Sequence, residues 1–79
     1  MQNNTKTVSL SDIVISGKFK KHPPSVNKIA RCYDYYKHHN GRLERINIVV
    51  GKGNILEDGY VSYLIYKMFG VEEIEVIAA

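Results

Sequence analysis

The junction around Asp58-Gly59 has the residue types of an anion-binding site. A short apolar segment, Ile55-Leu56, indicates a strand that ends there, and an amphipathic helix is predicted to begin directly after it. A glycine turn at a helix start leaves backbone N–H groups free at the positive end of the helix dipole, where phosphate groups bind. The candidate phosphate contacts are the first residues of this helix: Gly59, Tyr60, Val61 and Ser62.

Asp58 allows a second, purely structural interpretation of the same junction. Its carboxylate can itself accept hydrogen bonds from the first N–H groups of the helix, and it places a negative charge where a phosphate would sit. We favour this role for Asp58, with Gly59 serving only to make the turn. A bound anion then needs positive charge from elsewhere, and Lys28 is the first candidate.

Basic side chains are concentrated in the first two thirds of the chain. Residues 1–54 carry ten Lys or Arg against three acidic residues, a net charge of +7, whereas residues 55–79 carry one Lys against five acidic residues, a net charge of −4. Such a basic region attracts phosphate-bearing partners such as DNA. Solvated surface is the simpler explanation, and we rank it slightly ahead. The candidate nucleic-acid contacts are Lys18, Lys20, Lys21 and Arg31.

Few residues have the pattern of a catalytic or metal site. Glu57 and Asp58 are adjacent carboxylates at a strand end, where neighbours point apart, so they are weak candidates for Mg²⁺-assisted chemistry. Cys32 falls in the middle of a predicted helix, away from any helix N-terminus that would lower the pKa of its thiol. The three histidines have no metal-binding spacing. We therefore expect no metal site and favour a protein without catalytic activity.

Six of the 79 residues are tyrosines. Three are expected in the core or at its rim: Tyr33, Tyr36 and Tyr63. The others are expected to be partly exposed, most simply through amphipathic packing at the rim: Tyr35, Tyr60 and Tyr66. Exposed rings beside basic side chains can also stack on bases. That interpretation gains weight if Tyr60 faces the same groove as Lys28.

The elements in the first half follow from apolar periodicity and turn residues. After a flexible tail at residues 1–7, alternating apolar residues at 8–15 predict a short strand and a turn or second strand segment, followed by a lysine-bearing loop at 17–24. A helix is predicted from Val26 to His38 or His39, with Ser25 as its N-cap and Asn40-Gly41 as its stop. Its expected buried stripe is Val26, Ile29, Ala30, Tyr33 and Tyr36 or Lys37.

The second half begins with the expected central strand, Ile46–Val50. A turn at residues 51–54 is then expected to reverse the chain, so that the short strand Ile55-Leu56 pairs back as a hairpin. The second helix ends at Gly70, and its expected stripe is Val61, Leu64, Ile65 and Met68, with Phe69 nearby. Residues 71–77 predict a final strand that could form a sheet edge open to pairing with another copy.

The fold class is therefore α/β (α+β), a compact domain over residues 8–79 with the order β-α-β-β-α-β. Two main helices are expected to pack on a small mixed sheet. The single cysteine cannot form an internal disulfide, and no apolar run approaches the roughly 20 residues that span a bilayer. These features predict a soluble cytoplasmic protein with no membrane partner.

An ordered set of segments between Leu10 and Ile77 resembles the ParB/sulfiredoxin superfamily, in its small ParB-like "nuclease domain" branch. The segments are Leu10-Ser11-Asp12-Ile13, Pro24, Lys28-Ile29, Ile46-Asn47-Ile48-Val49-Val50, Leu56-Glu57-Asp58-Gly59-Tyr60, Tyr63-Leu64, Phe69-Gly70-Val71 and Val76-Ile77. Each piece alone is common, and their order and spacing together are moderately specific. The resemblance implies the sulfiredoxin-like fold.

The chain departs from this superfamily at the junction itself. Sulfiredoxins have Gly-Cys-His-Arg there, with a catalytic cysteine and basic residues that hold ATP phosphates. ParB partition proteins have Gly-Glu-Arg-Arg, which holds the triphosphate of CTP. This chain has Gly59-Tyr60-Val61-Ser62, and a serine hydroxyl cannot replace the bidentate, charged contact of an arginine with phosphate. The resemblance thus implies a degenerate phosphate site and no sulfiredoxin chemistry.

The resemblance implies a small DNA- or nucleotide-binding module in a bacterial or mobile-element context, with CTP or ATP and Mg²⁺ as candidate ligands. Two alternatives stay open. One is a structural or protein–protein interaction module, including a homodimer. The other is a vestigial nuclease or nucleotide-dependent phosphotransferase that uses Glu57, Asp58 and a lysine. We rank binding first, interaction second and catalysis third.

Overall fold

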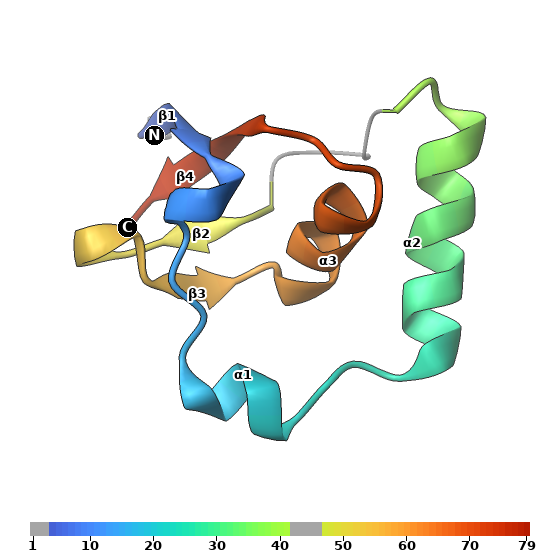
Figure 1. The fold of residues 1–79 in the computed structure, drawn as a ribbon, viewed down its shortest axis with the longest axis horizontal. Coiled ribbons are helices and arrows are strands. Elements are labelled where there is room, and N and C mark those ends of the chain that lie inside the picture. The colour runs from blue at the N-terminus through green and yellow to red at the C-terminus, as the bar shows by residue number, and fades with distance from the viewer. Residues whose placement is uncertain (1–3, 42–46) are drawn as a thin grey trace.

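A computed structural model describes residues 4–41 and 47–79 and shows a mixed α/β domain (Figure 1). The first expected residue of the central strand, Ile46, lies outside the described residues. The elements are, in chain order, β1 (Thr5–Ser9), a 3-10 turn (Leu10–Asp12), α1 (Gly17–Lys21), α2 (Val26–His38), β2 (Val49–Val50), a 3-10 turn (Lys52–Asn54), β3 (Leu56–Asp58), α3 (Tyr60–Met68) and β4 (Glu73–Ala78).

The four strands form one sheet in the order β1-β4-β2-β3. β4 pairs with β1 antiparallel and with β2 in parallel, and β2 pairs with β3 antiparallel, so the predicted mixed sheet is confirmed. The idea that residues 71–77 form an open sheet edge is wrong, because β4 has a partner on each side. Pairing between copies through this strand therefore loses its structural basis.

β1 begins earlier than its sequence indicates. Thr5 to Thr7, which we expected in the flexible tail, lie in the sheet, with Thr5 opposite Ile77 and Ser9 opposite Glu73. The three residues before Val8 lack apolar periodicity, and their side chains are exposed. They form a strand because β4 offers an unpaired row of backbone groups, which polar residues satisfy as well as apolar ones.

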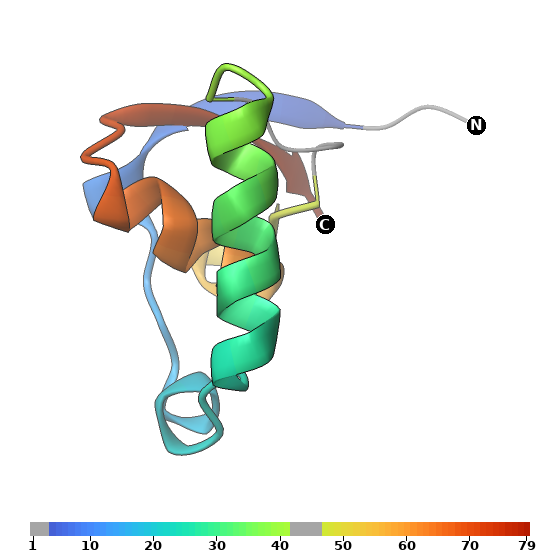
Figure 2. The same ribbon diagram turned by 90° about the vertical axis from the view of Figure 1, so that its right-hand side faces the viewer.

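The helices form two successive layers on the sheet. α3 lies between the sheet and α2 in Figure 1, and Figure 2, turned by 90°, shows α2 crossing in front of it. The side chains with almost no exposed surface come from the strands, the segment before β2 and the inner helix: Ile48, Val50, Leu56, Ile65 and Val76. α2 therefore covers α3 and not the sheet, which leaves α2 only a narrow buried face.

The cap and stop of α2 are confirmed. The backbone N–H of Lys28 donates to Ser25 Oγ at 3.2 Å, and Asn40 and Gly41 have left-handed φ angles of 56° and 77°. Two members of its expected stripe are exposed, Val26 at 81% and Ala30. α3 has nine residues against thirteen in α2, so it cannot cover the full length of its partner.

Two further expectations about helices need correction. Residues 17–21, expected within a loop, form the short helix α1. In α3, Met68 is 59% exposed instead of buried, whereas Ser62 and Tyr63 are buried. The sequence pattern missed this difference in the buried face because the side chains of α2 next to α3 include the Cys32 thiol and the Tyr36 ring, beside which a serine packs as well as an apolar residue. None of the helices in the described part of the chain is long and apolar enough to span a membrane.

Candidate ligand-binding cleft

An open cleft of about 380 Å³ lies between α1, the start of α2 and the junction of β3 with α3. It brings together all five candidate phosphate contacts, although Lys28 and Gly59 are far apart in the chain. Its lining consists of Phe19, His22, Pro24, Lys28, Asn47, Asp58, Gly59, Tyr60, Val61 and Ser62. The tertiary structure thus places Lys28 of α2 and the glycine turn in the lining of the same cleft.

Gly59 is required by its backbone and by its neighbours. Its φ angle is 87°, in the left-handed region, and it is the N-cap residue of α3. A Cβ atom there would lie 2.5 Å from the carbonyl oxygen of Asn47 and 2.7 Å from Cα of Ile48. Only glycine allows the segment before β2 to approach the turn so closely.

Asp58 adopts part of the structural role that we favoured. Its Oδ1 accepts a hydrogen bond of 2.8 Å from the N–H of Gly59. No cap hydrogen bond from the side chain of the N-cap residue reaches the first turn of α3, since that residue is a glycine. The carboxylate therefore stabilises the turn and also contributes a negative charge to the cleft, whose lining includes Lys28 and His22.

Ser62 has a different environment from the other candidate phosphate contacts. It is only 3% exposed, and its hydroxyl is hydrogen-bonded to the Cys32 thiol of α2. Ser62 therefore lines the cleft with very little exposed surface, and its hydroxyl interacts with α2 across the helix interface. Because the Gly59 N–H already donates to Asp58, this leaves the backbone N–H groups of Tyr60 and Val61 and the Lys28 ammonium as the groups of the candidate set that can meet an anion.

Burial raises the pKa of the Cys32 thiol, and the hydrogen bond from Ser62 lowers it by a smaller amount. Since the thiolate is the nucleophile, this environment suppresses thiol reactivity.

We expect Cys32 in the folded protein to react several-fold more slowly with a disulfide reagent at pH 8 than in the chain unfolded by urea, because a raised pKa leaves less thiolate and burial limits access. The measurement is the absorbance of the released thiol. Equal rates in the two states would show that the thiol is not shielded.

The candidate nucleic-acid contacts surround this cleft but do not line it. Lys18, Lys20 and Lys21 are exposed on α1, whose Phe19 does line the cleft. Arg31 is exposed on α2, one turn after Lys28, so the two share a side of the helix. Exposed positive charge therefore continues from α1 past the cleft to α2.

Aromatic rings form one wall of the cleft. The ring centroids of Phe19 and Tyr60 are 5.3 Å apart, and those of Tyr60 and Tyr63 are 6.2 Å apart. Tyr60 and Lys28 line the same cleft, which is the condition that we set for base stacking. Sequence reasoning missed Phe19, His22 and Asn47. The signal for Phe19 was present, because this ring is interleaved with the lysines of α1.

The carboxylates of Glu57 and Asp58 diverge, as neighbouring residues of a strand should. The Glu57 side chain lies over Gly51 before the β2–β3 turn, whereas the Asp58 side chain turns back to the N–H of Gly59. Within residues 4–41 and 47–79, no group of three His, Cys, Asp or Glu side chains comes together in a metal-binding arrangement. The geometry does not favour catalysis by this pair.

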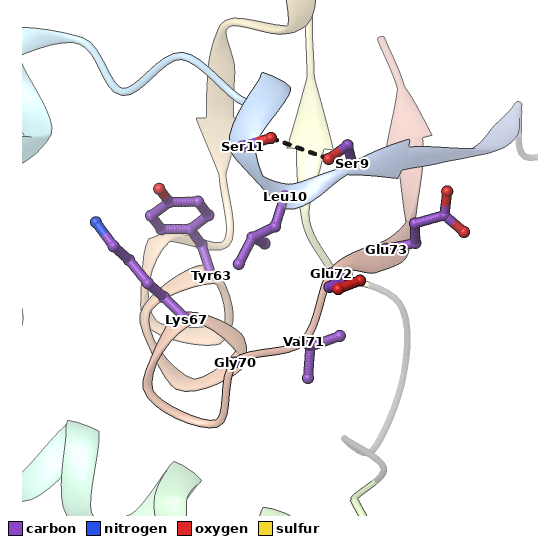
Figure 3. A pocket seen from close by; sticks show the side chains of 9 residues that line it. All are labelled: Ser9, Leu10, Ser11, Tyr63, Lys67, Gly70, Val71, Glu72 and Glu73. Atoms are coloured by element: carbon purple, nitrogen blue, oxygen red, sulfur yellow. Dashed lines mark hydrogen bonds between the residues drawn. The ribbon is translucent and has the colours of Figure 1, made fainter.

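A larger cavity of about 900 Å³ lies at the other end of α3 (Figure 3). Its lining includes Lys67 of α3, Glu72 before β4 and Glu73 at the start of β4, and Ser9 and Ser11 in its lining are hydrogen-bonded to each other. It contains one lysine against two glutamates and none of the candidate residues. We therefore assign the ligand site to the smaller cleft, where the basic and aromatic groups gather.

Comparison with solved structures identifies the fold. The chain superimposes on the pNOB8-like ParB N-domain in two structures, one of them described as the C2221 form, with TM-scores of 0.78 and 0.76. Each match covers 98% of this chain at 19% sequence identity. The chain spans 30% and 27% of the length of those two chains. No family model and no curated protein sequence matches the chain.

Proposed function

Because the chain has a ParB-like fold, we propose that it is a binding module for a phosphate-bearing ligand, either DNA or a nucleotide, and that the cleft at the β3–α3 junction receives it. The setting that we propose is the cytoplasm, in a bacterial or mobile-element context. The observation that carries the proposal is the meeting of Lys28 with the glycine turn at the start of α3 in one cleft.

The chemistry of the cleft supports phosphate binding without an arginine. The N–H groups of the first turn of α3 lie at the positive end of the helix dipole, and the Lys28 ammonium adds a full charge. Asp58 opposes this charge, and a lysine makes a less directional contact than a guanidinium. The affinity for an isolated phosphate is therefore expected to be modest and to fall with salt.

The proposal is tested by a ¹⁵N–¹H NMR titration with CTP, with ATP and with a short DNA, each in the presence of Mg²⁺. We expect shifts centred on Gly59, Tyr60 and Val61 and on Lys28. Lys28→Gln should weaken binding by about three- to tenfold, as expected for loss of one charged hydrogen bond near a partly open site.

Lys52→Gln is the matched control, since Lys52 is exposed in the β2–β3 turn and does not line the cleft. It removes the same charge and should leave binding nearly unchanged. Shifts centred on another surface, or equal losses for the two variants, would contradict the assignment of the ligand to this cleft.

A further inference from the structure

We infer that the ligand of the cleft is a single-stranded nucleic acid, with its bases stacked on Phe19 and Tyr60 and its phosphates placed along the lysines of α1 and α2. This inference rests on the proposed function, because it specifies the ligand class for the same site. It is carried by the juxtaposition of a fixed aromatic wall with a row of exposed positive charges.

The aromatic wall is held in place before any ligand binds. Phe19 and Tyr60 are half-buried, pack against the hydrophobic core and contact each other at 5.3 Å with a tilt of 47°. Both also line the cleft. Rings that are already fixed lose little conformational entropy when a base stacks on them, so the stacking free energy is retained in the affinity.

Positive charge lies directly beside these rings. The Lys18 ammonium sits 5.2 Å from the centroid of the Phe19 ring, and Lys20 and Lys21 are exposed on the same short helix. Lys28 lines the same cleft. A single strand whose base lies against the rings can therefore place successive phosphates near the lysines of α1 and near Lys28.

The wall favours unpaired bases over a duplex. Paired bases are stacked on one another and show only their edges in the grooves, so a protein ring cannot lie against a base face. A protein usually reads a duplex with a helix or a two-stranded ribbon that enters the major groove. Here the rings line a concave cleft, and the neighbouring helix α1 has only five residues. A single strand exposes the base faces that this surface can use.

A single-stranded nucleic acid also matches the distribution of lysines around the cleft better than a mononucleotide does. A nucleotide fills the cleft with one base and its own phosphates, and it leaves the lysines of α1 without a partner. A strand engages the cleft and the lysines of α1 together, so affinity should increase with the length of the strand and fall steeply with salt. Length dependence therefore separates the two ligands.

The test is a fluorescence-anisotropy titration of the wild-type protein with a labelled oligothymidine of about twelve nucleotides, with a duplex of the same length and, in competition, with CTP. We expect the single strand to bind about tenfold or more tightly than either. Phe19→Leu and Tyr60→Leu keep apolar volume but remove the ring, and each should weaken single-strand binding by about tenfold.

Tyr35→Leu is the control variant, because the Tyr35 ring stacks on His39 of its own helix region and does not line the cleft. Tyr60→Phe keeps the ring and should bind like the wild type. Circular dichroism and thermal melting show whether each variant is folded, and the wild-type comparison of strand and duplex does not depend on any variant.

Two results would overturn the inference while leaving the proposed function intact. One is equal or tighter binding of the duplex or of CTP by the wild-type protein. The other is unchanged single-strand binding in folded Phe19→Leu and Tyr60→Leu while Lys28→Gln still weakens it. If the wild-type protein binds neither nucleic acid nor nucleotide, the proposed function itself fails and the inference falls with it.

Discussion

Gly59→Ala is expected to lower the free energy of unfolding by about 2–4 kcal/mol. The added Cβ meets the backbone at Asn47 and Ile48, and the φ angle of 87° disfavours any side chain. The backbone of the segment before β2 cannot move aside like the end of a flexible side chain. Urea unfolding followed by circular dichroism measures the change.

Gly53→Ala is the matched control for this prediction. Gly53 also has a left-handed φ angle, 72°, but among residues 4–41 and 47–79 no atom beyond its chain neighbours lies within 4 Å of the position that its Cβ would take. This variant therefore carries the conformational cost alone, about 1 kcal/mol. Equal losses for the two variants would contradict the expected clash between a Cβ at position 59 and the backbone of the segment before β2.

Ser62→Arg is expected to destabilise the domain by about 3 kcal/mol or more and not to restore a strong phosphate site. The superfamily resemblance places an arginine at this position, so the substitution restores the residue type of the motif. The Ser62 side chain, however, is 3% exposed and faces Cys32 between α2 and α3. A guanidinium at this buried position loses its hydration, or it forces the helices apart.

Ser62→Ala provides the reference for this variant. It loses only the hydrogen bond to Cys32, so we expect a cost of about 1 kcal/mol. The measurements are the thermal midpoint of each variant and an NMR titration with CTP and Mg²⁺. A Ser62→Arg protein that is as stable as the wild type and binds CTP more tightly would show that the helix interface tolerates the phosphate-binding arginine.

Local sequence signals predicted the elements that depend on local chemistry. The Ser25 cap, the Asn40-Gly41 stop and the glycine turn at residue 59 all lie where their backbone requirements place them. These features need only a side-chain oxygen within three residues or a residue that accepts a positive φ angle. Such requirements depend only on residues that are neighbours in the sequence, so they can be predicted without knowledge of the fold.

Features that depend on partners distant in the chain were not predictable in this way. The pairing of β4 with both β1 and β2 abolished the expected edge, and the short span of α3 left Val26 exposed. In both cases the outcome depends on which element lies alongside, and apolar periodicity does not specify the length or position of that neighbour.

The sequence by itself determined the candidate residues of the site, because a glycine before an amphipathic helix and a cluster of lysines have recognisable chemistry wherever they occur. Only the tertiary structure decided which of them act together. It brought Lys28 and Phe19 to the glycine turn and turned the Ser62 hydroxyl into the helix interface. Residue type sets the available chemistry, but packing between distant segments sets the direction in which each side chain points.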